Sequence, residues 1–514
     1  MKRIFALFCC LVMALSLFGC SQDLDSYTPT GDGLTWEEGQ TQPTQEEEEA
    51  SDQELNLIYY PDRSMNPYVC TDYTNRALFS LLYQSLFVVD RGYNVEPMLC
   101  KNYKISQDMR TYTFYPEAAV FSDGSVLTSQ DVVQSLLAAK ESVYYSGRFT
   151  HVKSITVAED GGVVVTLDTD YENFLILMDI PILKQGQTQL DYPIGTGPYT
   201  LELTGDTARL RRRNDWWCKA EMVITAPVIG LKKAESNTQI RDEFEFSDLD
   251  LVCADPGSDR YADYRCDYEL WDCENNIFLY LCCNMNSEVF SNPEVRSALV
   301  YAVDRDTLVE EYYRGFARSS NLPASSLSPY YNPTLAARYA YDGGVKLKEA
   351  VSQIILPEDP IIFLVNKEDS LRVRVARKIA EVLRSAGLSV QMEEVGASTY
   401  QMYLNRGIYD LYLGQTKLSA NMDLSPFFSS SGALNYGSIA DIGMYTLCNE
   451  ALANHGNFYT LHQTIMEDGR LCPILMRSYA VYATRGLLTG LTPARDSVFY
   501  YSIGKTLERA QIFD

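Results

Sequence analysis

The segment PIGTGPYTL, residues 193–201, places two glycines around a threonine directly ahead of an apolar run. Such a turn could cradle a phosphate, but a dinucleotide fingerprint needs a third glycine and a following helix. Here Pro198 follows at once, and residues 199–203 alternate as a strand does before the hairpin signal Gly205-Asp206. The glycines therefore precede a predicted strand.

The composition of the whole chain is that of an ordinary globular protein. Its 514 residues are 46% hydrophobic and 22% charged, which is enough for two or more cores. The formal net charge of −25 argues against a nucleic-acid surface, which needs clustered cations. One basic cluster lies on the second arm of the predicted hairpin and is interpreted as a solvated face: Arg209, Arg211, Arg212 and Arg213.

The N-terminus has the pattern of an export signal. Lys2 and Arg3 precede an apolar segment at residues 4–18, and Leu17-Phe18-Gly19-Cys20 resembles a bacterial lipobox. The apolar run falls short of the roughly twenty residues needed to span a membrane. We therefore expect residues 1–19 to be a signal peptide and Cys20 to carry a lipid at the outer face of the membrane.

Residues 20–53 are predicted to form an acidic tether. Residues 21–53 hold ten acidic and no basic residues and almost nothing apolar, so they cannot repay the entropy of ordering. A charged tether extends, which lifts the folded body away from the membrane.

Ten cysteines follow the predicted lipidation site, and their spacing fits neither C-x-x-C nor a zinc pattern. Export permits disulfides, but sequence alone cannot pair these residues. We favour buried thiols.

The first half of the body is rich in β-structure. Residues 55–60 are typical of a strand, residues 76–89 have helical character, and residues 152–167 indicate two strands broken at Asp160-Gly161-Gly162. Residues 121–124 predict a turn, and Thr128 with Asp131 predicts a capping box at a helix start.

The second half alternates strand and helix. Strands are predicted at residues 361–365, 388–395 and 409–413, with helices at 371–386 and 398–405 between them. This alternation predicts a βαβαβ unit, hence a parallel sheet with helices packed on it. Earlier, Asn292 and Pro293 predict the start of a helix whose pattern breaks near Gly315.

Seven segments in order resemble the family 5 extracellular solute-binding proteins, the peptide and nickel type that feeds ABC importers. The matching segments are MNPY (65–68), LLYQSLFVVD (81–90) with Pro97, TYTFYPEAAVFSDGSVLTSQDVVQSL (111–136), PIGTGPYTL (193–201), RRRNDWW (211–217), DLDLV (248–252) and NPEVRSALVYAVDRDTLV (292–309).

The resemblance implies an α/β fold, a two-lobe clamp of the periplasmic-binding-protein type (type II) with an extra subdomain in the first lobe. We expect lobe I at residues 54–275 with a return segment at 479–514, and lobe II at 276–478. The turn of residues 193–201 then belongs to lobe I as a backbone device, in which Gly195 and Gly197 allow φ values that other residues resist.

The family's peptide binders often carry Gly-Trp-x-x-Asp, whose Asp pairs the peptide amine. An ungapped match here puts Gly414 on the Gly, Gln415 on the Trp and Leu418 on the Asp, while the nearest carboxylate is Asp423. Oligopeptide is the preferred ligand interpretation. The candidate pocket residues, chosen because the matching segments border the cleft, are Asn66, Tyr68, Asp423, Asn435 and Tyr436.

Other functions fit less well. Only three histidines are present, at 151, 455 and 462, so no metal or other cofactor is expected. No G-x-S-x-G or H-E-x-x-H motif occurs, so no enzyme is predicted. Among the 37 tyrosines are adjacent pairs that could line a cleft or pack the lobes, at 59/60, 144/145, 312/313, 330/331 and 500/501.

The favoured hypothesis is a monomeric substrate-binding lipoprotein that delivers a small solute to ABC permease subunits and binds no nucleic acid. Two alternatives stay open: a surface sensor or adhesion-type module that uses the same clamp, and an importer component for oligosaccharide rather than peptide.

Overall fold

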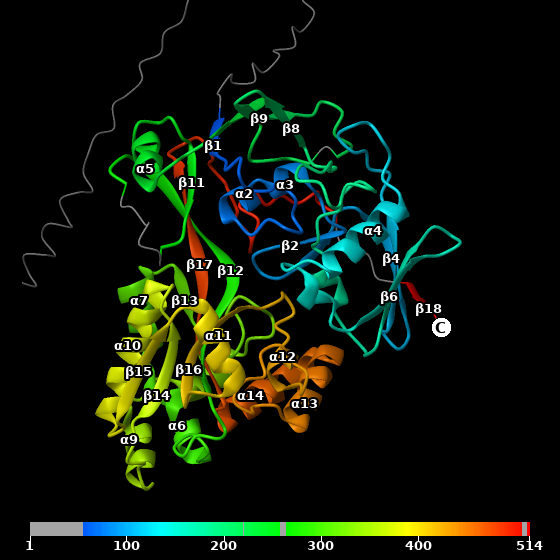
Figure 1. Cartoon of the computed structure of the whole chain (residues 1–514). Helices are drawn as coiled ribbons and strands as arrows, with labels where there is room; N and C mark the ends of the chain where they lie inside the picture. The colour runs from blue at the N-terminus through cyan, green and yellow to red at the C-terminus, as the bar shows by residue number, and fades with distance from the viewer. Residues whose placement is uncertain (1–54, 219, 257–263, 506–510, 514) are drawn as a thin grey trace, which may run out of the picture. The chain divides into compact units, whose positions relative to one another are not determined.

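The computed structural model describes residues 55–218, 220–256, 264–505 and 511–513 (Figure 1). The predicted signal peptide, the predicted lipidation site Cys20 and the predicted acidic tether lie outside the described residues. Within the described ranges, no helix combines the length and the apolar character that a membrane crossing needs.

The largest sheet in the described part of the chain has 11 strands, in the order β15-β14-β16-β12-β17-β11-β1-β10-β9-β8, with β13 paired to β17. Its two longest strands, β12 and β17, pair with each other along most of their length. The strands are β1 Leu55–Ile58, β8 Tyr199–Thr204, β9 Thr207–Arg212, β10 Val228–Lys232, β11 Leu251–Ala254, β12 Tyr268–Cys283, β13 Ala317–Ser319, β14 Ile361–Asn366, β15 Val390–Val395, β16 Leu411–Lys417 and β17 Leu471–Thr484.

The predicted βαβαβ unit is confirmed. Strand β14 pairs in parallel with both β15 and β16, while helix α10 (Ser370–Ser385) packs on β14 and β15 and helix α11 (Ala397–Arg406) packs on β14. Helix α10 buries its apolar positions, and Gly387, at φ +105°, lies just beyond its end. Strand β16 begins two residues later than predicted and continues to Lys417, which brings Gln415–Lys417 into the sheet.

A second sheet has five strands among the described residues, in the order β18-β4-β5-β7-β6, and α4 packs against β6 and β7 (Figure 1). The predicted capping box is present, since the Thr128 side chain accepts from the Asp131 amide and the Asp131 carboxylate accepts from the Thr128 amide. The elements are β4 Cys100–Ser106, β5 Thr111–Pro116, α4 Ser129–Lys140, β6 Val152–Val157, β7 Val163–Leu167 and β18 Gln511–Phe513.

Among the remaining helices, only the pattern from Asn292 to Gly315 was predicted, and the structure divides it into α6 and α7 at residues 303–304. Asn292 caps α6 with Pro293 at its first position, and α7 ends at Arg314 and Gly315, both with positive φ. The other helices are α5 Asn237–Glu245, α6 Pro293–Ala302, α7 Arg305–Tyr313, α8 Pro333–Ala336, α9 Val345–Ser352, α12 Ser425–Phe428, α13 Ile442–Ala453 and α14 Phe458–Asp468.

The predicted helical character of residues 76–89 is only partly right. The structure has two short helices, α2 (Tyr73–Ala77) and α3 (Phe79–Leu82), followed by strand β2 (Phe87–Val89), which pairs with β3 (Val95–Pro97). Tyr83 is extended and ends α3, so the β-branched residues after it pair with β3 instead of extending the helix.

Gly195 and Gly197 have a different role from the predicted one. Neither has a positive φ, so conformational freedom is not the reason for glycine here. A Cβ on Gly197 would lie 2.5 Å from the Leu81 carbonyl oxygen and 2.6 Å from that of Leu82, and the Gly197 amide donates to Leu82 O at 3.0 Å. The turn therefore allows close packing against α3, and its amide is not free for a phosphate.

Replacing Gly197 tests this packing. We expect Gly197→Ala to lower the free energy of unfolding by about 3 kcal/mol, because backbone atoms would have to move to admit the methyl group. Gly147→Ala is the matched control, since a Cβ there has no neighbour within 4 Å and φ is not positive. Chemical denaturation measures both, and equal stability of the two variants would contradict the packing role.

The predicted hairpin is formed by β8 and β9, and its basic cluster divides in two. Arg209 and Arg211 pair with Glu202 at the surface, as a solvated face should. Arg213 is instead buried, and its guanidinium donates to the backbone oxygens of Val120, Phe121 and Gly197. Its five-donor fork ties the turn to its neighbours, so the prediction of a solvated face is wrong for this residue.

All ten cysteines in the described ranges are free thiols, seven of them buried. His462 is also fully buried, and neither of its ring nitrogens has a hydrogen-bond partner among the described residues. Burial lowers the pKa of His462 to about 3, so the ring stays neutral at physiological pH.

Candidate ligand-binding site

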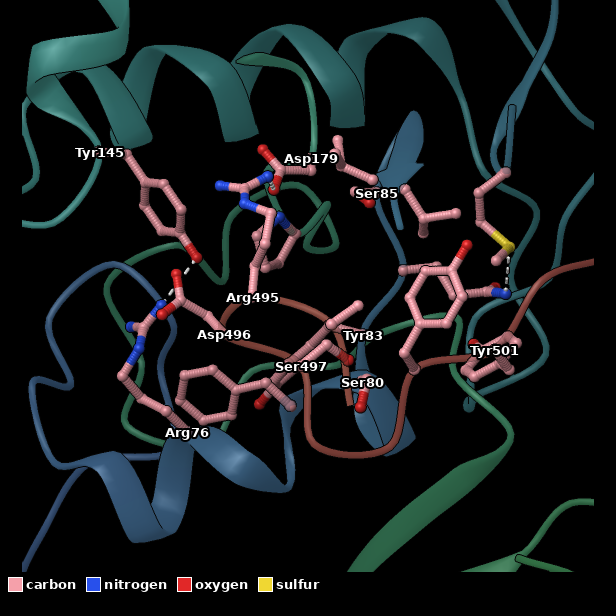
Figure 2. Close-up of a pocket in the computed structure, with 18 of the residues that line it drawn as sticks. Arg76, Ser80, Tyr83, Ser85, Tyr145, Asp179, Arg495, Asp496, Ser497 and Tyr501 are labelled. Atoms are coloured by element: carbon pink, nitrogen blue, oxygen red, sulfur yellow. Dashed lines mark hydrogen bonds and ion pairs between the residues drawn. The ribbon is translucent and has the colours of Figure 1, made fainter. Parts of the chain in front are cut away.

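Two adjoining pockets form the candidate site, and Arg76, Tyr144 and Asp496 line both. The first, here named the inner pocket, has about 800 Å³ of free space, part of it open to solvent, and lies among elements of predicted lobe I (Figure 2). The second, the cleft pocket, has about 620 Å³ and is also lined by residues 415–417 of predicted lobe II.

Arg76 lies at the junction of the two pockets. Its guanidinium donates to Pro67 O at 3.1 Å, to Cys70 O at 2.9 Å and to Tyr145 OH at 3.0 Å, and it covers the Tyr144 ring at 3.2 Å from the centroid. Burial would lower the pKa of Arg76, but its electrostatic surroundings raise it, so the side chain remains a cation.

Lys417, the last residue of β16, reaches across the cleft pocket. Its ammonium group lies 2.5 and 2.6 Å from the two Asp496 carboxylate oxygens and donates to Tyr144 OH at 2.6 Å. Burial raises the pKa of Asp496, but Lys417, Arg495 and Arg76 more than offset this, so its pKa lies below the usual carboxyl value. Burial lowers the pKa of Lys417, and Asp496 opposes that effect.

Two more arginines share one carboxylate on the wall of the inner pocket. Arg148 forms an ion pair with Asp179, and Arg495 donates to the other oxygen of Asp179 at 2.8 Å (Figure 2). Both arginines are nearly buried, with side chains 8% and 6% exposed. Arg495 precedes Asp496 and has φ +51°, an uncommon value for a non-glycine residue.

The other walls of the cleft pocket are held by stacking and hydrogen bonds. The rings of Tyr73 and Tyr479 are stacked with centroids 3.6 Å apart. Gln415 accepts a hydrogen bond from Arg477 at 2.8 Å, and Arg477 is itself paired with Asp255. These contacts fix side chains from distant segments around one space.

Two residues predicted to bind ligand are occupied by structural hydrogen bonds. Asn66 is buried, and its amide donates to Thr188 O at 2.9 Å and to Leu190 O at 2.8 Å. Tyr68 is also buried, and its hydroxyl donates to Pro181 O at 2.6 Å. Neither lines the two adjoining pockets, and their part in ligand binding stays a prediction.

The other three predicted residues also lie apart from these pockets. Asp423 accepts from Ser425 N at 2.8 Å and lines a smaller pocket of about 230 Å³. Asn435 accepts from Ala440 N at 3.1 Å. Tyr436 accepts from a side-chain amide of α11. Their roles stay predictions.

The structure shows what stands at the position where the family motif has its amine-binding Asp. Leu418 is buried and donates its amide to Asn276 O at 2.9 Å, so no carboxylate occupies that position. The neighbouring Lys417 points into the cleft pocket instead. The mismatch to Gly-Trp-x-x-Asp was therefore the sequence signal closest to the site.

Sequence reasoning missed Arg76, Arg148, Asp179, Arg495 and Asp496 as site residues. None belongs to a short sequence motif that indicates binding or catalysis, and these residues come together only in the folded chain. The tyrosine pairs gave a partial signal, because 144/145 and 500/501 both line the inner pocket.

The three histidines lie outside the two pockets. Nδ1 of His151 lies 2.9 Å from an Asp168 oxygen, and the His455 amide donates to Glu172 at 2.7 Å. No group of three or more His, Cys, Asp or Glu in the described ranges could hold a metal ion.

A match to a protein-family model assigns the chain to a family. The model of the bacterial extracellular solute-binding proteins, family 5 (its middle region), matches residues 94–436. The chain belongs to this family. It is therefore an extracytoplasmic solute-binding component of an ABC importer, and not an enzyme.

Individual relatives are distant. The glutathione-binding protein GsiB of Escherichia coli (strain K12) is 24% identical over 411 residues, which cover 71% of this chain and 76% of GsiB.

Solved structures share the mixed α/β periplasmic-binding-protein fold, with several sheets. CtaP of Listeria monocytogenes superposes with a TM-score of 0.72 at 18% identity, over 87% of this chain and 96% of CtaP. AppA of Bacillus subtilis, solved with a nonapeptide, gives 0.62 at 20% identity over 86% and 97%.

Asp179 should be necessary for the stability of this family 5 protein. Asp179→Asn keeps the side-chain shape but leaves Arg148 and Arg495 without their shared counter-charge, so we expect a loss of about 3 kcal/mol in the free energy of unfolding. Asp170→Asn is the matched control, because its pair with Arg110 is about half exposed and should matter little. Denaturant unfolding at pH 7 measures both, and an Asp179→Asn protein as stable as the control would contradict this role.

Proposed function

We propose that this family 5 protein captures oligopeptides or similar small solutes between two lobes and delivers them to the permease subunits of an ABC importer. The observation that carries the proposal is the junction of the two pockets. There Arg76, Tyr144 and Asp496 of predicted lobe I line both pockets, and Lys417 of predicted lobe II contacts Tyr144 and Asp496.

The lobes are proposed at residues 54–275 with 479–514, and at 276–478. A ligand in the inner pocket and the cleft pocket, together called the joined pockets, would contact both lobes. It would therefore bind the closed form better than the open form and shift the population by that difference in affinity. The closed form would then dock on the permease. The protein is proposed to act as a monomer.

Peptide is the favoured ligand class because relatives bind peptide or glutathione, itself a small peptide. Aromatic side chains around the pockets offer apolar area with polar tips, which suits backbone and side-chain contacts of varied sequence. Asn66, Tyr68, Asp423, Asn435 and Tyr436 remain proposed contacts that a bound structure would test.

The first test is thermal unfolding of the purified chain with di- to octapeptides, cello-oligosaccharides and Ni²⁺. A true ligand stabilises the native state by mass action, by about 2.7 kcal/mol at a hundredfold excess over its Kd. This stabilisation raises the midpoint temperature of unfolding. We expect peptides to raise it. A shift with sugars alone would favour the oligosaccharide alternative, and a shift with nothing would leave the peptide assignment without support.

Asp423→Ala separates two versions of the peptide proposal. If Asp423 pairs the peptide amine, the variant should lose the peptide-induced shift. If the shift survives, Asp423 does not serve the amine.

We also propose that Cys20 is lipidated after removal of residues 1–19 and holds the protein at the outer face of the membrane. Cys20→Ser should then move the protein from the membrane fraction to the soluble extracytoplasmic fraction. Immunoblotting of fractions measures this, with Cys218→Ser as the control because that thiol lies within the folded body. An unchanged distribution would contradict lipid anchoring.

A further inference from the structure

The joined pockets carry excess positive charge although the whole chain carries −25. Four cations and two carboxylates line them, a net charge of +2 when all six are ionised. The cations are Arg76, Arg148, Lys417 and Arg495, and the carboxylates are Asp179 and Asp496. Charges removed from water need counter-charges, so this site favours a ligand that brings negative charge.

The two carboxylates are already engaged. Asp179 serves Arg148 and Arg495, and Asp496 accepts two bonds from Lys417. An incoming ammonium group would have to displace Lys417 from Asp496. The chain's own ammonium thus fills the place where a ligand amine could pair.

Two guanidinium groups at the site keep unused donors. Arg76 uses three of its five N–H groups, all on neutral oxygens, and no other described residue accepts from it. The Nε of Arg495 is buried without a hydrogen-bond partner among the described residues. Arginine presents such donors in a planar fork that matches a carboxylate.

The inner pocket also has an apolar part. Its apolar lining is formed by Phe79, whose ring centroid lies 5.2 Å from the Arg76 guanidinium, and by Val88, Val89, Met98 and Tyr501 (Figure 2 labels Tyr501). Ser80 also lines the pocket, and its hydroxyl is buried with no partner in the described part of the chain. This lining suits an apolar side chain better than a charged one.

We propose that the ligand presents a carboxylate to Arg76 beside Lys417 and places an adjacent apolar side chain in the inner pocket, as the C-terminal residue of a peptide can do. This specificity rests on the proposed function and deepens it. Lys417 acts in two ways: it adds positive charge at the junction and it keeps Asp496 from receiving a ligand amine.

The test uses peptides Ala-Ala-Ala-Xaa, with Xaa as Phe, Leu or Ala, in four forms: free, N-acetylated, C-amidated and modified at both ends. Isothermal titration calorimetry on the purified chain gives each Kd. We expect N-acetylation to change the Kd by less than about threefold and C-amidation to weaken binding about thirtyfold or more, because a charged group left unpaired in a buried site is costly. Phe and Leu should bind better than Ala.

Variants assign the effect to residues. Lys417→Gln should shrink the preference for acid over amide and improve the binding of free-amine amides, while Lys417→Arg should retain the preference. Lys184→Gln is the matched control, since Lys184 pairs with Asp123 outside the joined pockets. Ser80→Phe should weaken Phe-terminated peptides more than Ala-terminated ones, and circular dichroism checks that the variant is folded.

The outcomes separate this inference from the proposed function. If acid and amide forms bind equally, or if acetylation rather than amidation abolishes binding, the carboxylate proposal is overturned while peptide binding stands. If no form binds, both the peptide function and the carboxylate proposal are overturned.

Discussion

The pairing of β12 with β17 is the constraint on which the rest of the structure depends. These strands run antiparallel through the middle of the largest sheet, and each also pairs with other strands along part of its length. Residues 277–283 of β12 also pair with β16, whereas residues 480–483 of β17 pair with β11.

The register of β12 and β17 shifts between Glu274 and Phe278, where Asn276 has φ +56°. Asn275, Ile277 and Tyr479 line the cleft pocket at this irregularity. A regular ladder would continue through this point, so the shift interrupts the pairing beside the cleft pocket without breaking the sheet.

Local patterns in the sequence predicted the elements that local chemistry decides. The capping box of α4 and the Asn292 cap of α6 each rest on residues within one turn of each other, and the elements of the βαβαβ unit each have a clear periodicity of their own. The run at 76–89 was predicted less well, because its last residues form strand β2, which pairs with β3 instead of continuing a helix. The glycines of 193–201 were predicted as a turn, but their reason, contact with Leu81 and Leu82, is a long-range fact.

The candidate site was the least predictable part, because it too depends on contacts between residues far apart in the sequence. Arg76 follows the segment 65–68, Lys417 ends β16, and Asp496 lies in the predicted return segment, so more than 400 residues separate the first from the last. A lone arginine or lysine in a sequence is most often a solvated side chain. Only burial against tyrosines and a shared carboxylate distinguishes these cations from the rest.

The chain's negative charge and the site's positive charge are compatible because they act over different distances. At physiological ionic strength, exposed charges are largely screened beyond about 8 Å, so the acidic surface does little to a small anion already inside the cleft. Within the pockets water is partly excluded, and the cations act with less screening. A polyanion would meet the acidic exterior over its whole length, whereas a short ligand with one carboxylate would not. The same arrangement thus favours small monoanions and disfavours nucleic acid, and it does so through placement of charge rather than through total charge.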